Sequence, residues 1–317
     1  MRLLVTGGAG FIGSNFVRQY LSGHSEDEII NLDLLTYAGN LNNLKAVGDN
    51  PKYSFVRGDV CDAKLVRKLL RDCDVIVNFA AETHVDRSFT DYMPFVRTNV
   101  LGTRTLLEAA LDSGVERFVQ VSSDEVYGSI IGGSFNESSP LNPTNPYSLT
   151  KAAADLLALS YHREQGLPVL VSRSSNNYGP FQNPEKLIPR FITNLLEDKK
   201  VPLYGDGLHV REWIHASDNC DAIETLIRKG SAGVYNVGSG CERTNLEVTH
   251  TLLNLLKMGE EYITYVADRP FHDRRYSLDS HKMRTLGWSP RLDFDSCLKS
   301  TIDWYKSNRW WWEPLKR

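Results

Sequence analysis

The sequence RLLVTGGAGFIG, residues 2–13, contains a short apolar run that ends directly in closely spaced glycines. The apolar run predicts a β-strand, and a helical pattern follows the glycines to about Leu21. Glycines let the backbone turn tightly near a phosphate, and the next helix offers it free N–H groups and a positive dipole end. This order predicts a parallel α/β sheet that binds a dinucleotide through Gly7, Gly10, Phe11, Ile12 and Gly13.

A second strand, within IINLDLLTY, ends in Asp33, and the interval from Gly13 is 33 − 13 = 20 residues. An acidic side chain at about this distance meets the ribose of the adenosine. Its carboxylate accepts hydrogen bonds from both ribose hydroxyls and repels a 2′-phosphate. The spacing therefore favours NAD over NADP.

Two later strand ends extend the same predicted site. YSFVRGDV places Asp59 and Val60 beyond a strand, at a position suited to the adenine edge. DVIVNFAAE carries another strand into Ala80, Ala81 and Glu82, where the small alanines let the cofactor lie close.

The segment FVQVSSDEVYG, residues 118–128, is an apolar strand pattern that ends in hydroxyl and carboxyl side chains. Ser123, Asp124 and Glu125 therefore stand at the carboxyl end of a strand, where open α/β sheets bind ligands. After a polar loop, PYSLTK begins a helix with proline in a favourable first position. Tyr147 and Lys151 lie four residues apart on that helix, so their side chains share one face.

That pair has a chemical use, because an ammonium group beside a phenol stabilises the phenolate. Bringing a tyrosine pKa from about 10 to near 7 requires roughly 4 kcal/mol, which a close cation and a positive cofactor ring can supply. Tyr147 then becomes a base that takes a proton from an alcohol while hydride leaves its carbon. A simple alcohol dehydrogenase has no need of Asp124 and Glu125.

Composition narrows the class of protein. The chain has 317 residues, 41% hydrophobic and 24% charged, which fits an ordinary globular protein of about two domains. A net charge of −3 without a Lys/Arg block argues against nucleic acid as a partner. No signal peptide and no apolar run of about 18 residues are found, so we expect a cytoplasmic protein without a membrane partner. Five cysteines without a CxxC motif predict reduced thiols and no metal site.

These patterns predict a Rossmann-type doubly wound parallel sheet with a smaller C-terminal α/β substrate-binding lobe. We assign residues 1–173 to the NAD-binding domain and residues 174–317 mainly to the second domain, with some segments interleaved. The predicted helices at 94–113 and around 152–161 carry apolar residues over more than one narrow stripe. This breadth predicts a homodimer through a helical bundle, although burial within one chain is equally consistent with it.

Longer segments point to a family. GGAGFIG, Asp33, a serine at a strand end and YxxxK together resemble the extended short-chain dehydrogenase/reductase superfamily. The whole chain is similar to dTDP-glucose 4,6-dehydratases in the segments LLTYAGNLNNL, AAETHVDRS, VSSDEVYGS, RSSNNYGPFQNPEKLIPRFI, PLYGDG, VREWIHASD and WYKSNRWWWEPLK. Two positions depart from the family pattern: Ser123 stands where the family usually has threonine, and Phe271 where DRPGH has glycine.

The resemblance implies an NAD-dependent oxidation, elimination and reduction that yields a 4-keto-6-deoxy nucleotide sugar for deoxysugar biosynthesis. Tyr147, with Lys151 and Ser123, would take the proton of the glucosyl 4-hydroxyl. Glu125 would remove the C5 proton, and a protonated Asp124 would deliver a proton to the departing 6-hydroxyl. Two adjacent carboxyl groups with opposed roles require opposed pKa values.

The resemblance also implies the substrate contacts. Asn176 would reach the sugar or diphosphate, and Lys186 and Arg211 would bind the diphosphate. The other implied substrate contacts are Thr83, Ser123, Leu187, Pro202, Leu203, Tyr204, Asn245, Arg269 and His272. The remaining implied cofactor contacts are Leu34, Thr36, Thr98 and Asn177.

Several alternatives stay open at this point. Within the superfamily, a 4-epimerase or a UDP-glucuronate decarboxylase would share NAD, Tyr147 and Lys151, and a non-catalytic NAD-binding regulator would share the fold. For His84 and Asp86, a hydrogen-bonded loop pair and a substrate contact are equally consistent with the sequence. The residues do not decide whether the nucleotide is dTDP or UDP, nor which deoxysugar pathway uses the product.

Overall fold

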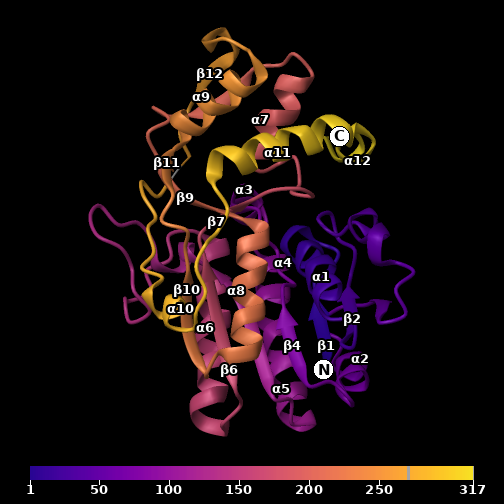
Figure 1. The fold of residues 1–317 in the computed structure, drawn as a ribbon. Coiled ribbons are helices and arrows are strands. Elements are labelled where there is room, and N and C mark those ends of the chain that lie inside the picture. Colours follow the sequence, from indigo (N-terminus) through magenta and orange to yellow (C-terminus); the bar gives the residue numbers. More distant parts are fainter. Residues whose placement is uncertain (270–271, 317) are drawn as a thin grey trace.

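In residues 1–269 and 272–316, which the computed structural model describes, seven strands form one parallel sheet (Figure 1). Their order is β10-β6-β5-β4-β1-β2-β3. The strands are β1 (Arg2–Thr6), β2 (Glu28–Asp33), β3 (Tyr53–Arg57), β4 (Val75–Asn78), β5 (Arg117–Ser123), β6 (Val169–Ser174) and β10 (Gly233–Val237). The order reverses between β1 and β4, the point at which such sheets bind dinucleotides. The predicted Rossmann-type fold is confirmed.

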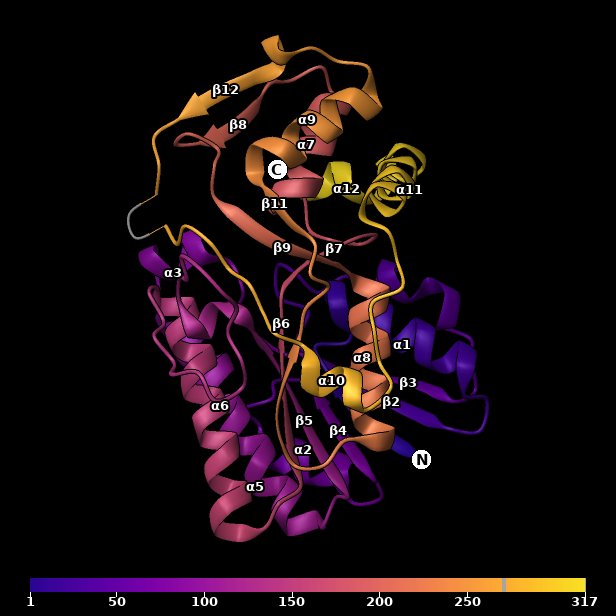
Figure 2. The same cartoon turned by 60° about the vertical axis from the view of Figure 1, so that its left-hand side comes forward.

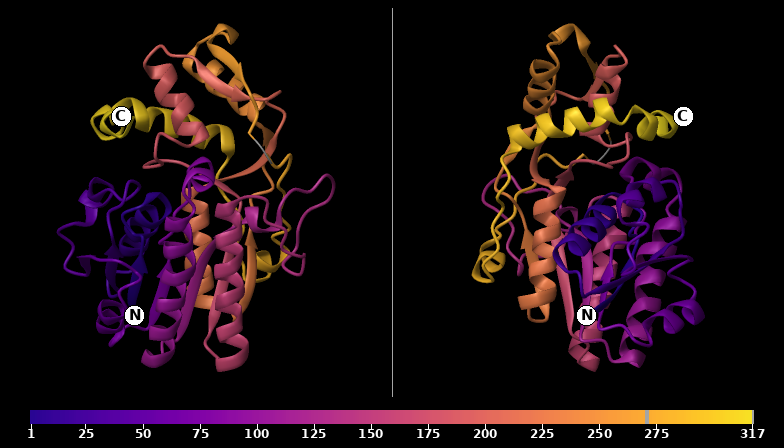
Figure 3. Two further views of the ribbon diagram at one scale, coloured as in Figure 1. Left: turned by 180° about the vertical axis from the view of Figure 1, so that it is seen from behind. Right: turned by 45° about the vertical axis from the view of Figure 1, so that its right-hand side comes forward.

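Helices cover both faces of this sheet, which explains why its strands are nearly continuous apolar runs. On β1, Leu3 and Val5 face one core cluster and Leu4 faces the other, and all three side chains are fully buried. The first face is covered by α1 (Phe11–Gly23) and α8 (Ala216–Lys229). The second is covered by α2 (Ala63–Leu70), α5 (Thr103–Ser113) and α6 (Pro146–Gln165), which Figure 3 shows from behind.

A smaller lobe stands over the carboxyl ends of the large sheet (Figure 2). It contains a sheet of order β11-β9-β7 and a pair β12-β8, with helices packed around one apolar core that includes the buried Trp311 and Trp312. Its strands are β7 (Asn176–Tyr178), β8 (Val201–Tyr204), β9 (Val210–His215), β11 (Glu242–Thr244) and β12 (Ile263–Val266). Its helices are α7 (Leu187–Leu196), α9 (Asn245–Leu256), α11 (Phe294–Ser307) and α12 (Arg309–Trp312).

The two lobes interleave in sequence. After β7 and β9 the chain returns to the large lobe as α8 and β10, and α10 (His281–Thr285) packs beside β10. Residues beyond 174 therefore contribute to both lobes, and the boundary assigned at that residue stays a prediction. The remaining short helices are η1 (Leu41–Val47), α3 (Val85–Thr90), α4 (Met93–Phe95), η2 (Val96–Gly102), η3 (Asp124–Tyr127), η4 (Glu260–Tyr262) and η5 (Glu313–Lys316).

The long helix predicted over residues 94–113 is continuous in the structure, but it is not α-helical throughout. The segment contains α4, then a π-helical stretch, η2, and only then α5. Within η2, the side chain of Asn99 accepts from the Glu82 N–H at 2.9 Å and donates to the Thr150 hydroxyl at 2.9 Å. Apolar spacing indicates a helix but does not register such side-chain contacts, which accompany a local widening of the turn.

Two further expectations concern the whole chain. Among the described residues, no helix combines the length and the apolar character needed to cross a membrane. All five cysteines lie in the described part of the chain, and each is a free thiol. Phe271, one of the two departures from the family pattern, lies outside the described residues.

Candidate active site

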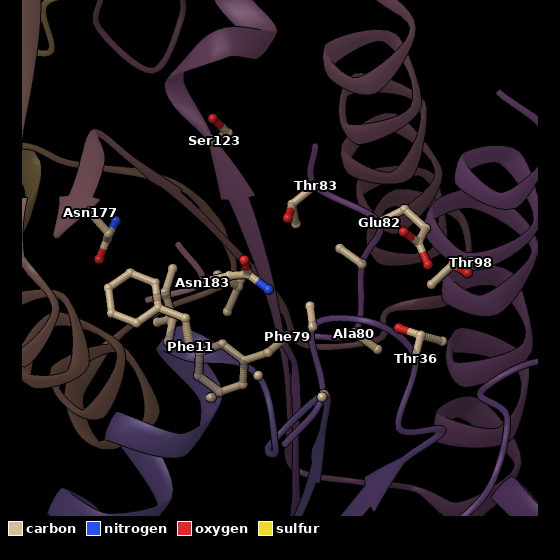
Figure 4. A pocket seen from close by; sticks show the side chains of 18 of the residues that line it. Phe11, Thr36, Phe79, Ala80, Glu82, Thr83, Thr98, Ser123, Asn177 and Asn183 are labelled. Atoms are coloured by element: carbon tan, nitrogen blue, oxygen red, sulfur yellow. The ribbon is translucent and has the colours of Figure 1, made fainter. Parts of the chain in front are cut away.

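A cavity of about 280 Å³ lies at the carboxyl ends of the central strands. Figure 4 shows Phe11, Asn177 and Asn183 on one side of it and Thr36 and Glu82 on the other. Every residue predicted to contact the cofactor lines this cavity: Gly7, Gly10, Phe11, Ile12, Gly13, Asp33, Leu34, Thr36, Asp59, Val60, Ala80, Ala81, Glu82, Thr98, Tyr147, Lys151 and Asn177.

The glycine turn is required by close backbone packing. Gly7 has φ +68°, and a Cβ there would lie 2.6 Å from the Ala80 nitrogen. A Cβ on Gly13 would lie 2.4 Å from the Gly7 carbonyl oxygen. The turn therefore brings the start of α1 against the end of β4, where the N-terminus of the helix faces the cavity.

Asp33 is held in place by backbone N–H groups. Its Oδ2 accepts from Ala9 at 2.9 Å and its Oδ1 accepts from Leu35 at 2.8 Å. Burial raises the pKa of Asp33, and these two hydrogen bonds oppose the rise. Since a carboxylate has about four acceptor positions, two are left for the hydroxyls of a ribose.

Buried polar atoms without a partner among the described residues gather at the same place. They include Ser122 Oγ, Asp124 Oδ2, Ser175 Oγ, Asn176 Oδ1 and Gln182 Oε1, all from residues that line a cavity. Because buried polar atoms in proteins are nearly always hydrogen-bonded, their concentration here indicates a polar ligand. Together with the glycine turn and the fixed carboxylate of Asp33, these residues fit a dinucleotide cofactor.

Tyr147 and Lys151 are positioned by a well-capped helix. Pro146 occupies the start of α6, and Asn145 and Ser148 form a reciprocal capping box, with the Ser148 N–H donating to Asn145 Oδ1 at 2.9 Å. One turn further, Lys151 Nζ donates to the carbonyl oxygen of Val121 on β5 at 2.5 Å. The cap and this bond fix both predicted catalytic side chains against the end of β5.

The protein's own groups do not lower the pKa of Tyr147 as expected. Burial raises it, the charge of Glu125 raises it further, and hydrogen bonding to Ser123 only partly opposes the rise. Burial also lowers the pKa of Lys151 to about 8, and the charge of Asp155 opposes that fall. The phenolate therefore depends on positive charge that a bound cofactor would add beside these buried side chains.

Asp124 and Glu125 face the cavity from η3, directly after β5. Burial raises the pKa of Asp124 well above its usual value, and the charges of Glu125 and Glu212 add to the rise. Burial also raises the pKa of Glu125, but there the cations Arg211 and Lys186 oppose it. The two adjacent carboxyl groups thus differ in environment, and Asp124 is the one favoured in its protonated form.

A second cavity, of about 180 Å³, lies between the lobes and adjoins the first. Both are lined by Glu125, Asn176, Asn177, Gln182, Glu185 and Lys186. The predicted substrate contacts in the second cavity are Asn176, Lys186, Leu187, Pro202, Leu203, Tyr204, Arg211, Asn245, Arg269 and His272, whereas Thr83 and Ser123 line the first. The structure therefore brings all the predicted residues into two connected cavities, with Glu125 at the junction.

Three cations from separate segments converge on the second cavity. Lys186 donates to the carbonyl of Thr83 at 2.8 Å, and Arg211 donates to the carbonyl of Asp273 at 2.9 Å. Arg269 pairs with Asp86 at 3.2 Å. Burial lowers the pKa of Lys186. Acidic side chains also line this cavity, but the ammonium and guanidinium groups of these three residues are the kinds of donor that bind a diphosphate.

His84 and Asp86 do not form the loop pair that was one of their two alternatives. The Nδ1 of His84 accepts from the Arg87 N–H at 3.3 Å as the cap of α3, while Asp86 pairs with Arg269. Both residues line the second cavity. The geometry therefore leaves a substrate-facing position for each.

Sequence reasoning missed several lining residues. Asn183 and Glu185 belong to the segment NPEK, which was quoted for the resemblance but not assigned. Trp213 lies two residues beyond Arg211 on β9 and thus on the same strand face. The alternation of side chains along a strand could have predicted that it lines the cavity. Asp273 and Tyr276 come from a loop without a local pattern. The other unassigned lining residues include Phe79, Ser174, Phe181, Gln182, Arg190 and Phe191.

One cluster has metal-ligand composition. His209, Asp268 and His272 place a ligand atom each within 4.8 Å of one another. The two imidazole rings, however, stack with centroids 3.7 Å apart and planes 20° apart. A metal in the plane of one ring would lie well out of the plane of the other, where its nitrogen lone pair does not point.

The fold and the two cavities define an enzyme of the extended short-chain dehydrogenase/reductase class with a site for a nucleotide-linked substrate. The family model described as GDP-mannose 4,6 dehydratase matches residues 4–301. Two curated relatives are dTDP-glucose 4,6-dehydratases. That of Streptomyces niveus is 53% identical and that of Streptomyces antibioticus 55%, and each match covers 100% of this chain and 96% of the relative.

A solved structure agrees with these relatives. The dTDP-glucose 4,6-dehydratase of Streptomyces venezuelae, crystallised with NAD and dTDP, superposes with a TM-score of 0.98 at 55% identity, over 99% of this chain and 100% of that one. This chain belongs to the dTDP-glucose 4,6-dehydratase family, and the resemblance inferred from its motifs is confirmed.

Proposed function

We propose that this protein is an NAD-dependent hydro-lyase that converts dTDP-glucose to dTDP-4-keto-6-deoxyglucose in deoxysugar biosynthesis. The observation that carries the proposal is the pair of a buried Asp124 and a partly buried Glu125, which have unlike environments in the cavity that also holds Tyr147 and Lys151. When bound, NAD accepts hydride from C4 of the glucosyl ring and later returns it to C6. Free cysteines are typical of the reducing cytoplasm, where we propose that the enzyme acts.

In the first step Tyr147 removes the proton of the 4-hydroxyl. Ser123 lies close enough for its hydroxyl to favour the phenolate by hydrogen bonding, and Lys151 is fixed one turn away on the same helix face. The Ser123 hydroxyl orients the alcohol, and the ammonium of Lys151 adds its positive charge to the charge that a bound cofactor would supply. The substitution of serine for the usual threonine keeps the hydroxyl and loses a methyl group that would restrict its rotamer.

The elimination step uses the acidic pair. A ketone at C4 acidifies the hydrogen on C5, and Glu125, whose negative charge Arg211 and Lys186 favour, removes that proton. Asp124, kept neutral by burial and by two neighbouring carboxylates, donates a proton to the departing 6-hydroxyl. Opposite proton transfers from adjacent residues require this difference in charge state.

The second cavity accounts for binding of the nucleotide. Lys186 and Arg211 neutralise the diphosphate, a task that Mg²⁺ performs in many nucleotide sites. Asn176 lines both cavities and would hold the sugar. The base would lie against Leu187, Pro202, Leu203 and Tyr204, with Asn245, Arg269 and His272 completing the pocket.

The rival enzymes explain less of the site. Epimerisation at C4 releases no hydroxyl group, so it leaves a neutral Asp124 without a task. A UDP-glucuronate decarboxylase also releases no hydroxyl group, so it too leaves a neutral Asp124 without a task, and its product would be accompanied by CO₂. A non-catalytic regulator would not need the fixed arrangement of Ser123, Tyr147 and Lys151.

The test is the product formed from dTDP-glucose by purified protein. We expect the mass of the nucleotide sugar to fall by one water with no consumption of added NADH. Conversion of UDP-glucose to UDP-galactose, or release of CO₂ from UDP-glucuronate, in place of that product would refute the proposal. Absence of turnover with every hexose nucleotide, by a folded protein that retains NAD, would favour the regulator.

We further propose that two copies pair through the outer faces of η2 and α6. Figure 3 shows α6 beside α5, which continues η2, on the outside of the large lobe. Leu101, Leu149 and Leu156 are each about half exposed there, which is unusual for neighbouring large apolar side chains. Light scattering should give the mass of a dimer for the wild type and of a monomer for Leu156→Glu. Leu292→Glu, at a similarly exposed leucine elsewhere, is the control.

A further inference from the structure

A buried ion pair lies one helical turn beyond Lys151. Asp155 on α6 is fully buried, and its Oδ2 accepts from the Nε of Arg173 on β6 at 2.9 Å. Arg173, itself 2% exposed, donates through Nη1 to the Tyr127 hydroxyl at 2.9 Å. That hydroxyl donates in turn to Asn236 Oδ1 at 2.8 Å. A continuous polar chain thus runs from below the catalytic helix face to β10.

A buried ion pair is not needed to pack α6 against the large sheet. Replacing a buried pair of charges by apolar residues of similar volume is often neutral or stabilising, because desolvation of both charges is costly. α6 already packs on the sheet through apolar side chains such as Ala158. The position of Asp155 four residues after Lys151 places its charge on the same face of the helix as the catalytic ammonium.

The other groups around this turn are known. From α6 itself, Tyr147 and Lys151 face the cavity. From η3, Asp124 and Glu125 lie close enough to Tyr147 for their charges to raise its pKa. β5 contributes the Val121 carbonyl and the neutral Ser122, β6 contributes Arg173, and η2 contributes the neutral Asn99 through Thr150. Among these residues, Asp155 carries the charge that opposes the fall in the Lys151 pKa caused by burial.

We propose that Asp155 is a positioning residue that keeps Lys151 protonated and directed along the catalytic face of α6, held there in turn by Arg173. The inference rests on the proposed function, since it assigns a part in the same proton transfer. Its charge acts on both catalytic groups in a definite direction. It favours the ammonium of Lys151 and disfavours the phenolate of Tyr147, so it raises the pKa of both.

Removal of the Asp155 charge should therefore shift the pH dependence of activity, whereas loss of a purely structural contact should not. In Asp155→Asn the pKa of Tyr147 and the pKa of Lys151 both fall. The acid limb of the activity profile follows ionisation of the tyrosine and the alkaline limb follows deprotonation of the lysine. Both limbs move to lower pH, by about one pH unit, the scale on which a neighbouring charge shifts a buried pKa.

The experiment compares pH profiles of kcat/KM for dTDP-glucose in wild type, Asp155→Asn and Tyr127→Phe. Tyr127→Phe is the matched control, because it removes a hydrogen bond from Arg173 in the same chain of contacts without changing a charge. We expect a profile displaced to lower pH for Asp155→Asn and an undisplaced one for Tyr127→Phe. Loss of activity by the same factor at every pH in Asp155→Asn would overturn the inference and leave a structural ion pair.

Asp155→Asn leaves the buried charge of Arg173 without a partner, so this variant can fail to fold. A second variant tests the inference in that case. Asp155→Asn/Arg173→Met removes both charges, a change that buried pairs tolerate well. We expect the same displacement to lower pH, because Asp155 is the charge that acts on Lys151. An undisplaced profile in a folded double variant would overturn the inference. Wild-type protein without dehydratase activity would instead refute the proposed function, so the two failures are distinguishable.

Discussion

Glu125→Gln separates the oxidation step from the elimination step. Glutamine is nearly isosteric with glutamate and keeps an oxygen that can accept from Asn145 Nδ2, the 3.3 Å contact that Glu125 makes at the start of α6. The variant should therefore fold like the wild type. It lacks the carboxylate that we propose removes the C5 proton, whereas Tyr147, Lys151 and Ser123 are intact.

The structure gives the size and sign of each effect. Loss of a positioned general base typically costs about 10²- to 10⁴-fold in rate, so elimination should slow by that factor. The charge of Glu125 raises the pKa of Tyr147 and of Asp124, so its removal lowers both. Ionisation of Tyr147 becomes easier, and oxidation at C4 should proceed at least as readily as in the wild type.

The assay is a single turnover with dTDP-glucose, followed by the near-ultraviolet absorbance of NADH on the protein. We expect Glu125→Gln to accumulate NADH and to release almost no 4-keto-6-deoxy product. Tyr147→Phe is the matched control, and it should form no NADH because it lacks the phenolate. If both variants lost hydride transfer equally, the division of roles between Tyr147 and Glu125 would be wrong.

Three further predictions follow from single residues. Asp124→Asn should lower turnover about 10²- to 10⁴-fold, because it removes the proposed proton donor. It should also raise Tm at neutral pH. The raised pKa of Asp124 makes the native state hold a proton that the unfolded chain releases, and this cost to folding stability disappears as the pH falls below the pKa in the unfolded chain. An unchanged Tm would contradict this. Asp33→Asn should lower the preference for NAD over NADP by about tenfold or more, measured by equilibrium binding, because it removes a charge that repels a 2′-phosphate. Arg211→Met should raise KM for dTDP-glucose about 10- to 150-fold, which corresponds to the loss of one hydrogen bond to a charged group. Arg274 is an exposed arginine paired with Asp206, so Arg274→Met should leave KM unchanged. Equal effects of the two arginine variants would argue against Arg211 as a diphosphate ligand.

The sequence alone determined the large lobe and the cofactor site, because their signals are local. A strand, a glycine turn and a helix are adjacent in the chain, and Asp33 follows at a fixed interval set by one crossover. Tyr147 and Lys151 share a helix face through a four-residue spacing that any α-helix enforces. Each of these features is the same whatever the rest of the chain does.

Other properties were decided by the tertiary structure. The sequence places Asp124 and Glu125 side by side, and only the family resemblance assigned them different roles. Arg211 and Lys186, which come from the small lobe, oppose protonation of Glu125. The charge of Glu212 on β9 favours protonation of Asp124. The return of α8 and β10 to the large sheet likewise depends on strand pairing between distant segments.

The physical reason is common to these cases. The charge state of a buried group depends on how much water it loses and on which charges lie within a few ångströms, and both are set by contacts between segments far apart in the chain. The rise in the Tyr147 pKa shows this directly, because burial and the charge of Glu125 raise it although Lys151 lies one turn away on the same helix. Spacing in the sequence determined which residues meet at the site, and folding determined which of them carry a proton.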